Sequence, residues 1–111
     1  MGKLPNHDKA IIPQAKIADY LLSLTHRDGK SKAKFFRASG FSPTEWEIMA
    51  EALKHHAAVH KLGKIETSPF GMRYVIEGEM LTPDNRNPEI RSVRFIRTGS
   101  DIPYFVTAYP L

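Results

Sequence analysis

The chain has 111 residues, of which 41% are hydrophobic and 25% are charged, and it contains no cysteine. These values are typical of one globular domain, and they exclude disulfides, thiolate metal sites and cysteine nucleophiles. The formal net charge is +4, and residues 26–37 alone carry it, because the other residues hold 11 basic and 11 acidic groups. A charge concentrated in this way points to a phosphate-bearing partner.

The chain has no run of eighteen apolar residues, and residues 1–8 lack the apolar centre of a secretory signal. We therefore expect a cytoplasmic protein with no membrane partner. Residues 1–111 are expected to form a single domain.

The pattern of apolar residues predicts three helices in the first half of the chain, at about residues 13–60. The first helix runs from Pro13 to near Thr25, because its apolar residues recur at helical spacing. Gly29 separates it from the second helix, over residues 30–39, which is followed by a terminating glycine.

The third helix has the clearest start signal. Ser42 is a good capping residue, Pro43 suits a first turn, and Glu45 is placed to complete a capping box. The apolar stripe that follows predicts a helix that runs to about His60 and ends before Gly63.

The second half, at about residues 64–110, is rich in aromatic and β-branched residues divided by turn-prone segments. Strands are predicted at residues 64–67, 72–81, 89–97 and 104–109. Their short connections favour an antiparallel meander. We therefore predict an α+β fold in which about three helices pack on one face of a four-stranded antiparallel sheet.

The second predicted helix has a basic side, because Lys30, Lys34 and Arg37 fall at helical spacing while Ala33 and Phe36 lie on another side. Such a helix is either a solvated amphipathic helix or a nucleic-acid-binding surface. The neutrality of the rest of the chain leaves both interpretations open.

Histidines supply the candidate proton-transfer groups. His26 lies beside the basic stretch, and imidazole titrates near neutrality; the alternative is a histidine that interacts with a helix end. His56 and His60 stand one turn apart, as in helical zinc sites, and His55 adjoins them. A third ligand is missing, so the helix dipole explains this cluster better than a metal, and no metal or cofactor is expected.

Alternation in the last two predicted strands places Arg91 and Arg97 on one face and Arg94 on the other. Thr107 and Tyr109 likewise share one face of the last strand. The plain alternative is the exposed polar face of an antiparallel sheet. The chain has no Walker-type phosphate loop and no nucleophile elbow, which argues against an ATPase or a serine hydrolase.

The chain resembles a bacterial domain-of-unknown-function family of about this length. The resemblance rests on Ile17-Ala18-Asp19-Tyr20-Leu21-Leu22, His26, Gly29, Lys32-Ala33-Lys34-Phe35-Phe36, Pro69-Phe70-Gly71, Tyr74, Thr82-Pro83-Asp84, Arg86, Arg91 and Val106-Thr107-Ala108-Tyr109-Pro110. Members occur as small free-standing proteins and as terminal modules of large bacterial and phage proteins. They are similar to the nuclease superfamily that joins barnase, EndoU, colicin-type tRNases and RelE (BECR).

That resemblance implies helices followed by a four-stranded antiparallel sheet, and RNA cleavage without a metal. Carried over residue by residue, it implies a catalytic site formed by His26, Lys32, Arg91, Thr107 and Tyr109. The chain departs from the family pattern at Arg27, Arg94 and Tyr104-Phe105, where it adds or retains positive charge and aromatic surface.

The leading hypothesis is a metal-independent endoribonuclease, such as the toxin of a toxin–antitoxin or polymorphic-toxin system. RNA would be its substrate, and an antitoxin or immunity protein its protein partner. The expected nucleic-acid contacts are Lys30, Lys34, Arg37 and Arg94. One alternative is a non-catalytic nucleic-acid-binding or immunity-type module, and another is a structural protein that pairs through a sheet edge. The sequence leaves the oligomeric state and the register of the last two strands open.

Overall fold

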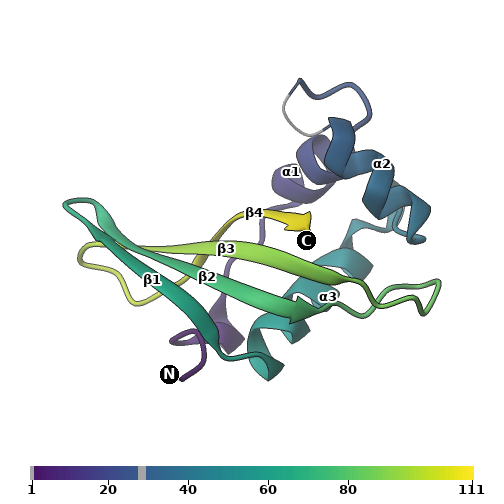
Figure 1. The fold of residues 1–111 in the computed structure, drawn as a ribbon. Coiled ribbons are helices and arrows are strands. Elements are labelled where there is room, and N and C mark those ends of the chain that lie inside the picture. The colour runs from purple at the N-terminus through teal and green to yellow at the C-terminus, as the bar shows by residue number, and fades with distance from the viewer. Residues whose placement is uncertain (1, 28–29) are drawn as a thin grey trace.

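The computed structural model describes residues 2–27 and 30–111, so the predicted break at Gly29 lies outside the described residues. Helices occupy the first half of the chain and strands the second half (Figure 1). The four strands form one antiparallel sheet in chain order, and they are β1 (Leu62–Ser68), β2 (Gly71–Glu79), β3 (Glu89–Arg97) and β4 (Tyr104–Pro110). The predicted α+β fold with an antiparallel meander is confirmed.

The first helix is shorter than predicted. The short α1 (Gln14–Lys16) passes directly into a π-helical turn, η2 (Ile17–Leu21), in which the N–H of Leu22 bonds to the carbonyl of Ile17 at 2.8 Å. Leu22 then leaves the helical conformation, so the helix does not reach Thr25. Such wide turns are frequent at functional sites.

The second helix, α2 (Lys30–Ala38), lies where the sequence predicts it. Gly40 follows it with φ of 105°, a left-handed conformation that favours glycine. A Cβ at Gly40 would also approach Pro83 to 2.8 Å. The terminating role predicted for this glycine therefore has two physical causes, backbone conformation and close packing.

The predicted capping box before the third helix is wrong. The Ser42 hydroxyl lies 2.9 Å from the Thr44 hydroxyl and caps no backbone N–H. Pro43–Glu45 forms a 3₁₀ turn, closed by a bond from the Glu45 N–H to the Ser42 carbonyl, so α3 (Trp46–Val59) begins only at Trp46. The end of α3 agrees with the prediction.

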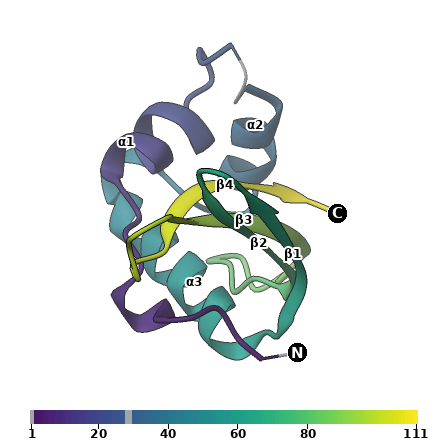
Figure 2. The ribbon, with the colours of Figure 1, turned by 90° about the vertical axis from the view of Figure 1, so that its left-hand side faces the viewer.

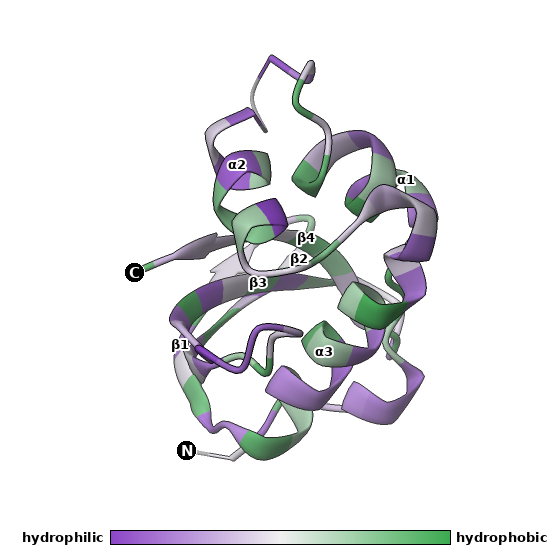
Figure 3. Ribbon diagram, turned by 90° about the vertical axis from the view of Figure 1, so that its right-hand side faces the viewer, coloured by the Kyte–Doolittle hydropathy of each residue, from purple (hydrophilic) through white to green (hydrophobic). Residues whose placement is uncertain are grey.

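The helices lie at different places around the sheet (Figures 1 and 2). Helix α3 covers one face, whereas α1, η2 and α2 gather beside β4. Hydrophobic and hydrophilic segments alternate along α2 and α3, as in amphipathic helices (Figure 3). The main core is formed by Ile17, Leu21, Leu22, Phe36, Phe41, Met49, Leu53, Met80, Ile90, Phe105 and Ala108.

Strand β3 shows how the two faces of the sheet differ. Its residues Ile90, Ser92, Arg94 and Ile96 are all buried, and Ser92 and Arg94 contact α3. Arg91 alternates with them and lies on the opposite face, which we call the open face. The predicted alternation is therefore confirmed, since Arg91 and Arg94 lie on opposite faces of β3. The face that carries Ser92 and Arg94, however, is buried against α3.

A bulge between β3 and β4 decides which side chains share the open face. Val93 pairs with Thr107, whereas the next residue, Arg94, pairs with Phe105, so Val106 is an extra residue in β4. Tyr109 pairs with Arg91 in the same register. The bulge leaves Phe105 in the core and places Thr107 and Tyr109 on the face that carries Arg91.

The helix dipole does not explain His56. This histidine is fully buried, and its Nε2–H donates a 3.1 Å hydrogen bond to the carbonyl oxygen of Gly78. Burial lowers the pKa of His56 to about 4, despite the opposing effect of that hydrogen bond. His56 is therefore neutral at pH 7 and does not serve as a cation at the helix end.

Neither a metal-binding cluster nor a membrane-spanning helix occurs in the part of the chain that the structure describes. Residues 2–27 and 30–111 contain no group of three His, Asp or Glu side chains placed to hold a metal ion. No helix within them is long and apolar enough to cross a membrane.

Candidate functional site

Lys32 lies at the centre of a polar cluster that joins three segments of the chain. Its ammonium group donates hydrogen bonds to the Tyr20 hydroxyl and, at 3.2 Å, to the Thr107 hydroxyl. The two hydroxyl oxygens are themselves 3.1 Å apart. We call Tyr20, Lys32 and Thr107 the hydroxyl–lysine cluster.

Core packing next to each residue holds this cluster in place. Tyr20 belongs to η2, between the fully buried Ile17 and Leu21. Lys32 precedes the buried Ala33, which anchors α2. Thr107 precedes the fully buried Ala108. The ring of Tyr20 also packs against the main core, so buried neighbours on all three segments hold the polar groups in place.

Lys32 changes the acidity of Tyr20. Partial burial by itself would raise the pKa of the phenol, but the hydrogen bonds to Lys32 and Thr107 and the positive charge of Lys32 outweigh burial. The pKa of Tyr20 is therefore lowered from its ordinary value. A tyrosine in this state gives up its proton more readily and is suited to accept one in a reaction.

His26 extends the cluster. Its ring stands edge-on to the ring of Tyr20, with the centroids 4.9 Å apart and an interplanar angle of 76°. His26 and Lys32 were predicted from the sequence as site residues, whereas Tyr20, which both of them contact, was not. The signal was present, because Tyr20 stands inside the first segment that carries the family resemblance.

Tyr109 connects the cluster to Arg91. The Lys32 nitrogen lies 5.9 Å from the centroid of the Tyr109 ring, and the guanidinium carbon of Arg91 lies 5.6 Å from it. Arg91 also donates a 3.2 Å hydrogen bond to the Tyr109 hydroxyl. The five predicted catalytic residues therefore form one continuous set of contacts, completed by Tyr20.

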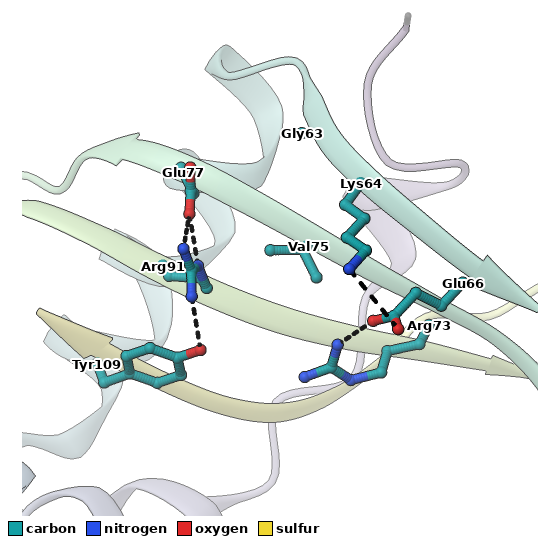
Figure 4. Close-up of a pocket in the computed structure, with 8 residues that line it drawn as sticks. All are labelled: Gly63, Lys64, Glu66, Arg73, Val75, Glu77, Arg91 and Tyr109. Carbon is teal, nitrogen blue, oxygen red and sulfur yellow. Dashed lines mark hydrogen bonds and ion pairs between the residues drawn. The ribbon is translucent and has the colours of Figure 1, made fainter. Parts of the chain in front are cut away.

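Arg91 is also paired with a carboxylate that the sequence analysis did not choose. Its Nε and Nη2 both contact Oε2 of Glu77, the directly opposite residue on β2 (Figure 4). The hydrogen bonds to Tyr109 and Glu77 raise the pKa of Arg91. Arg91 is thus a positioned cation whose charge is partly balanced before any ligand binds.

A groove of about 320 Å³ continues from this pair across the open face (Figure 4). It runs from Tyr109 on β4 to Gly63 on β1, with Val75 between them. The groove and the hydroxyl–lysine cluster meet at Tyr109. The candidate site therefore has two adjoining parts, a cluster beside β4 and a groove over the middle of the sheet.

The residues predicted to bind nucleic acid fall into two groups. Lys30 and Lys34 are exposed on α2, as a basic surface requires. Arg37 is exposed too, but its Nε donates a 2.7 Å hydrogen bond to the Leu22 carbonyl, which ties α2 to the end of η2. Arg37 therefore has a structural contact in addition to its charge.

The prediction that Arg94 binds nucleic acid is wrong, because its side chain is fully buried between α3 and the sheet. Its Nη2 donates to the Leu53 carbonyl at 2.7 Å, and its guanidinium carbon lies 5.2 Å from the Phe105 ring. Nε and Nη1 have no hydrogen-bond partner among the described residues. Burial lowers the pKa of Arg94 to about 10, so the group is still charged at pH 7.

Replacing Arg94 by methionine is expected to stabilise the protein. The substitution removes a buried charge and unpartnered N–H groups while keeping a long side chain, and we expect the free energy of unfolding to rise by about 1 kcal/mol or more. Urea denaturation at pH 7 measures this change. Arg97→Met on the exposed end of β3 is the control, with an expected effect within about 0.5 kcal/mol. If Arg94→Met is instead less stable than wild type, the contacts of the guanidinium outweigh the cost of burying its charge, and the prediction is wrong.

Fold and site together define an α+β protein with the hydroxyl–lysine cluster at one edge of an open antiparallel sheet. The chain belongs to the family described as domain of unknown function (DUF6883), whose model matches residues 3–111. No curated protein and no solved structure matched the chain. Membership of a domain-of-unknown-function family is thus confirmed, whereas the resemblance to barnase-like nucleases stays a prediction.

Proposed function

We propose that this protein is a metal-independent endoribonuclease that cleaves RNA by transesterification. The observation that carries the proposal is the Lys32 ammonium held between two hydroxyls, with His26 against one of them. In the reaction, a 2′-oxygen loses its proton to a base and attacks the adjacent phosphorus. The bond from phosphorus to the 5′-oxygen breaks, and that oxygen takes a proton from an acid. The products are a 2′,3′-cyclic phosphate and a 5′-hydroxyl end.

The cluster offers a group for each part of this reaction. Tyr20, with its lowered pKa, is the proposed base, and His26 is the proposed acid. Lys32 balances the negative charge that grows on the phosphorane oxygens, and Thr107 orients the ammonium group. Each proton-transfer group is expected to contribute on the order of 10²- to 10⁴-fold in rate.

The exposed basic side of α2 supports RNA as the substrate. Lys30 and Lys34 lie on the same helix as Lys32 and are open to solvent. Contacts from such residues to phosphates give affinity that falls as the salt concentration rises. They attract any RNA strand and select no sequence.

The test is incubation of the purified protein with total RNA in EDTA, followed by analysis of the fragment ends. Wild type is expected to produce cyclic phosphate ends, and His26→Ala to cleave at least about 10²-fold more slowly. His55→Ala is the matched control, because His55 is an exposed histidine on α3, and it should cleave like wild type.

Two outcomes would contradict the proposal. RNA that stays intact at a high excess of the protein would refute the nuclease assignment. Salt-sensitive RNA binding without turnover would favour the alternative of a non-catalytic binding module. Growth arrest on induced expression in a bacterium, relieved by His26→Ala, would further support the role of a toxin.

A further inference from the structure

The groove on the open face has a charge pattern different from that of the hydroxyl–lysine cluster. Arg91 contacts Glu77, Arg73 contacts Glu66, and Lys64 lies 3.9 Å from Glu66 (Figure 4). Cations and carboxylates therefore alternate along the groove. In the hydroxyl–lysine cluster, by contrast, the hydrogen bonds found among the described residues join one ammonium to two hydroxyls and include no carboxylate.

This difference determines which part of a nucleotide suits each region. A phosphate group only accepts hydrogen bonds and is repelled by carboxylates, so it fits the ammonium of Lys32 better than the groove. The edge of a nucleobase presents both donors and acceptors. A surface that alternates guanidinium donors with carboxylate acceptors complements such an edge.

The shape of the groove agrees with a ring-shaped ligand. Its volume of about 320 Å³ exceeds the roughly 30 Å³ share of a water molecule about tenfold. Val75 supplies an apolar side chain within it, and Tyr109 supplies an aromatic ring where the groove meets Lys32. Aromatic rings are the side chains on which bases of single-stranded nucleic acids stack.

Glu77 and Arg91 carry hydrogen-bonding capacity beyond their own pair. Both contacting nitrogens of Arg91 go to Oε2 of Glu77, so Oε1 is not used in this pair. A carboxylate oxygen accepts N–H groups from a base edge, and the five N–H groups of a guanidinium exceed the contacts that Arg91 makes to Glu77 and Tyr109.

We propose that this groove binds the nucleobase of a nucleotide next to the cleaved phosphodiester, and that Glu77 and Arg91 distinguish one base from another. The inference rests on the proposed function, since it places the phosphate at Lys32. Tyr109 stacks on the base and joins the two parts of the site. Glu77 is thereby a specificity-determining residue rather than a catalytic one.

The test measures binding of the four nucleoside 3′-monophosphates, with inorganic phosphate and ribose 5-phosphate as probes without a base. Titration calorimetry with wild type is expected to show at least about ten-fold tighter binding of the preferred nucleotide than of ribose 5-phosphate, the size of one stacking contact. In NMR titrations, the backbone amides of Gly63 and Val75 should shift with nucleotides and not with phosphate.

Two variants sharpen the result. Glu77→Gln is expected to change the ranking of the four nucleotides, and Tyr109→Leu to weaken all four by about ten-fold. Glu79→Gln is the matched control, because Glu79 is an exposed carboxylate on the same strand outside the groove. It should change neither the ranking of the four nucleotides nor their affinities. The wild-type NMR titration decides the question even where a variant fails to fold.

The failure of this inference is distinguishable from the failure of the nuclease assignment. Base-dependent binding by a protein that does not cleave RNA would support the nucleobase groove and contradict the nuclease assignment. Cleavage of RNA together with equal binding of all four nucleotides and ribose 5-phosphate would support the nuclease assignment and contradict the nucleobase groove.

Discussion

Replacing Lys32 by alanine is expected to slow RNA cleavage by about 10³-fold or more. The variant loses a cation that balances charge on the phosphorane, an effect typically worth about 10²- to 10³-fold. It also loses the hydrogen bond and the charge that lower the pKa of Tyr20, which leaves a weaker proton-transfer group at neutral pH. The rate of single-turnover cleavage of a short RNA, measured as a function of pH, reports both the overall slowing and the change in the proton-transfer group.

Lys34→Ala provides the matched control for Lys32→Ala. Lys34 is an exposed lysine on the same helix, so this variant removes the same charge from the basic surface of α2. We expect weaker RNA binding, most clearly at low salt, a shallower salt dependence of that binding, and a nearly unchanged rate at saturation. Equal slowing by both variants would mean that Lys32 acts only through RNA attraction.

A second readout for Lys32 does not depend on activity. NMR titration of ring-labelled tyrosine is expected to show the pKa of Tyr20 at a higher value in Lys32→Ala than in wild type, because the hydrogen bond and the positive charge are gone. An unchanged Tyr20 titration would contradict the coupling between these two side chains.

Acid is expected to destabilise the fold through His56 by about 3 kcal/mol between pH 6.5 and pH 4. Burial holds the pKa of His56 in the folded protein at about 4, whereas the pKa of an unfolded histidine is about 6.5. Between these values the unfolded chain binds a proton that the folded chain does not. The free energy of unfolding therefore falls as the pH is lowered through this window.

Urea denaturation of wild type and His56→Gln at a series of pH values isolates this contribution. Glutamine keeps a side-chain N–H for the Gly78 carbonyl but does not titrate, so its stability should depend less steeply on pH. His55→Gln replaces an exposed neighbour and should keep the wild-type slope. Parallel curves for wild type and His56→Gln would refute the assignment.

Local patterns predicted most of the secondary structure. The third predicted strand has the observed bounds of β3, and the other three differ from β1, β2 and β4 by at most two residues at each end. Alternation and turn residues act over a few positions, so they are readable without the fold. The π turn of η2 and the 3₁₀ turn at Pro43–Glu45 were not predicted, because they depend on how the chain packs.

The candidate site was predictable only in part. The resemblance and the charge pattern chose His26, Lys32 and Arg91, which the structure connects through tyrosines. Tyr20 was missed although it stands inside a segment that carries the resemblance, because its contact with Lys32 joins residues 12 positions apart. Glu77 was missed because nothing local distinguishes it from other exposed glutamates. Arg94 was misplaced, since an arginine in a strand is rarely expected to lie in a core.

The sequence by itself determined the α+β class, the order of helices and strands, and the concentration of positive charge in residues 26–37. Only the tertiary structure decided that Thr107 faces Lys32. The extra residue Val106 shifts the register of β4 against β3, and in a strand a shift of one residue turns every later side chain to the other face. Such a shift depends on contacts between distant segments, so no local pattern records it.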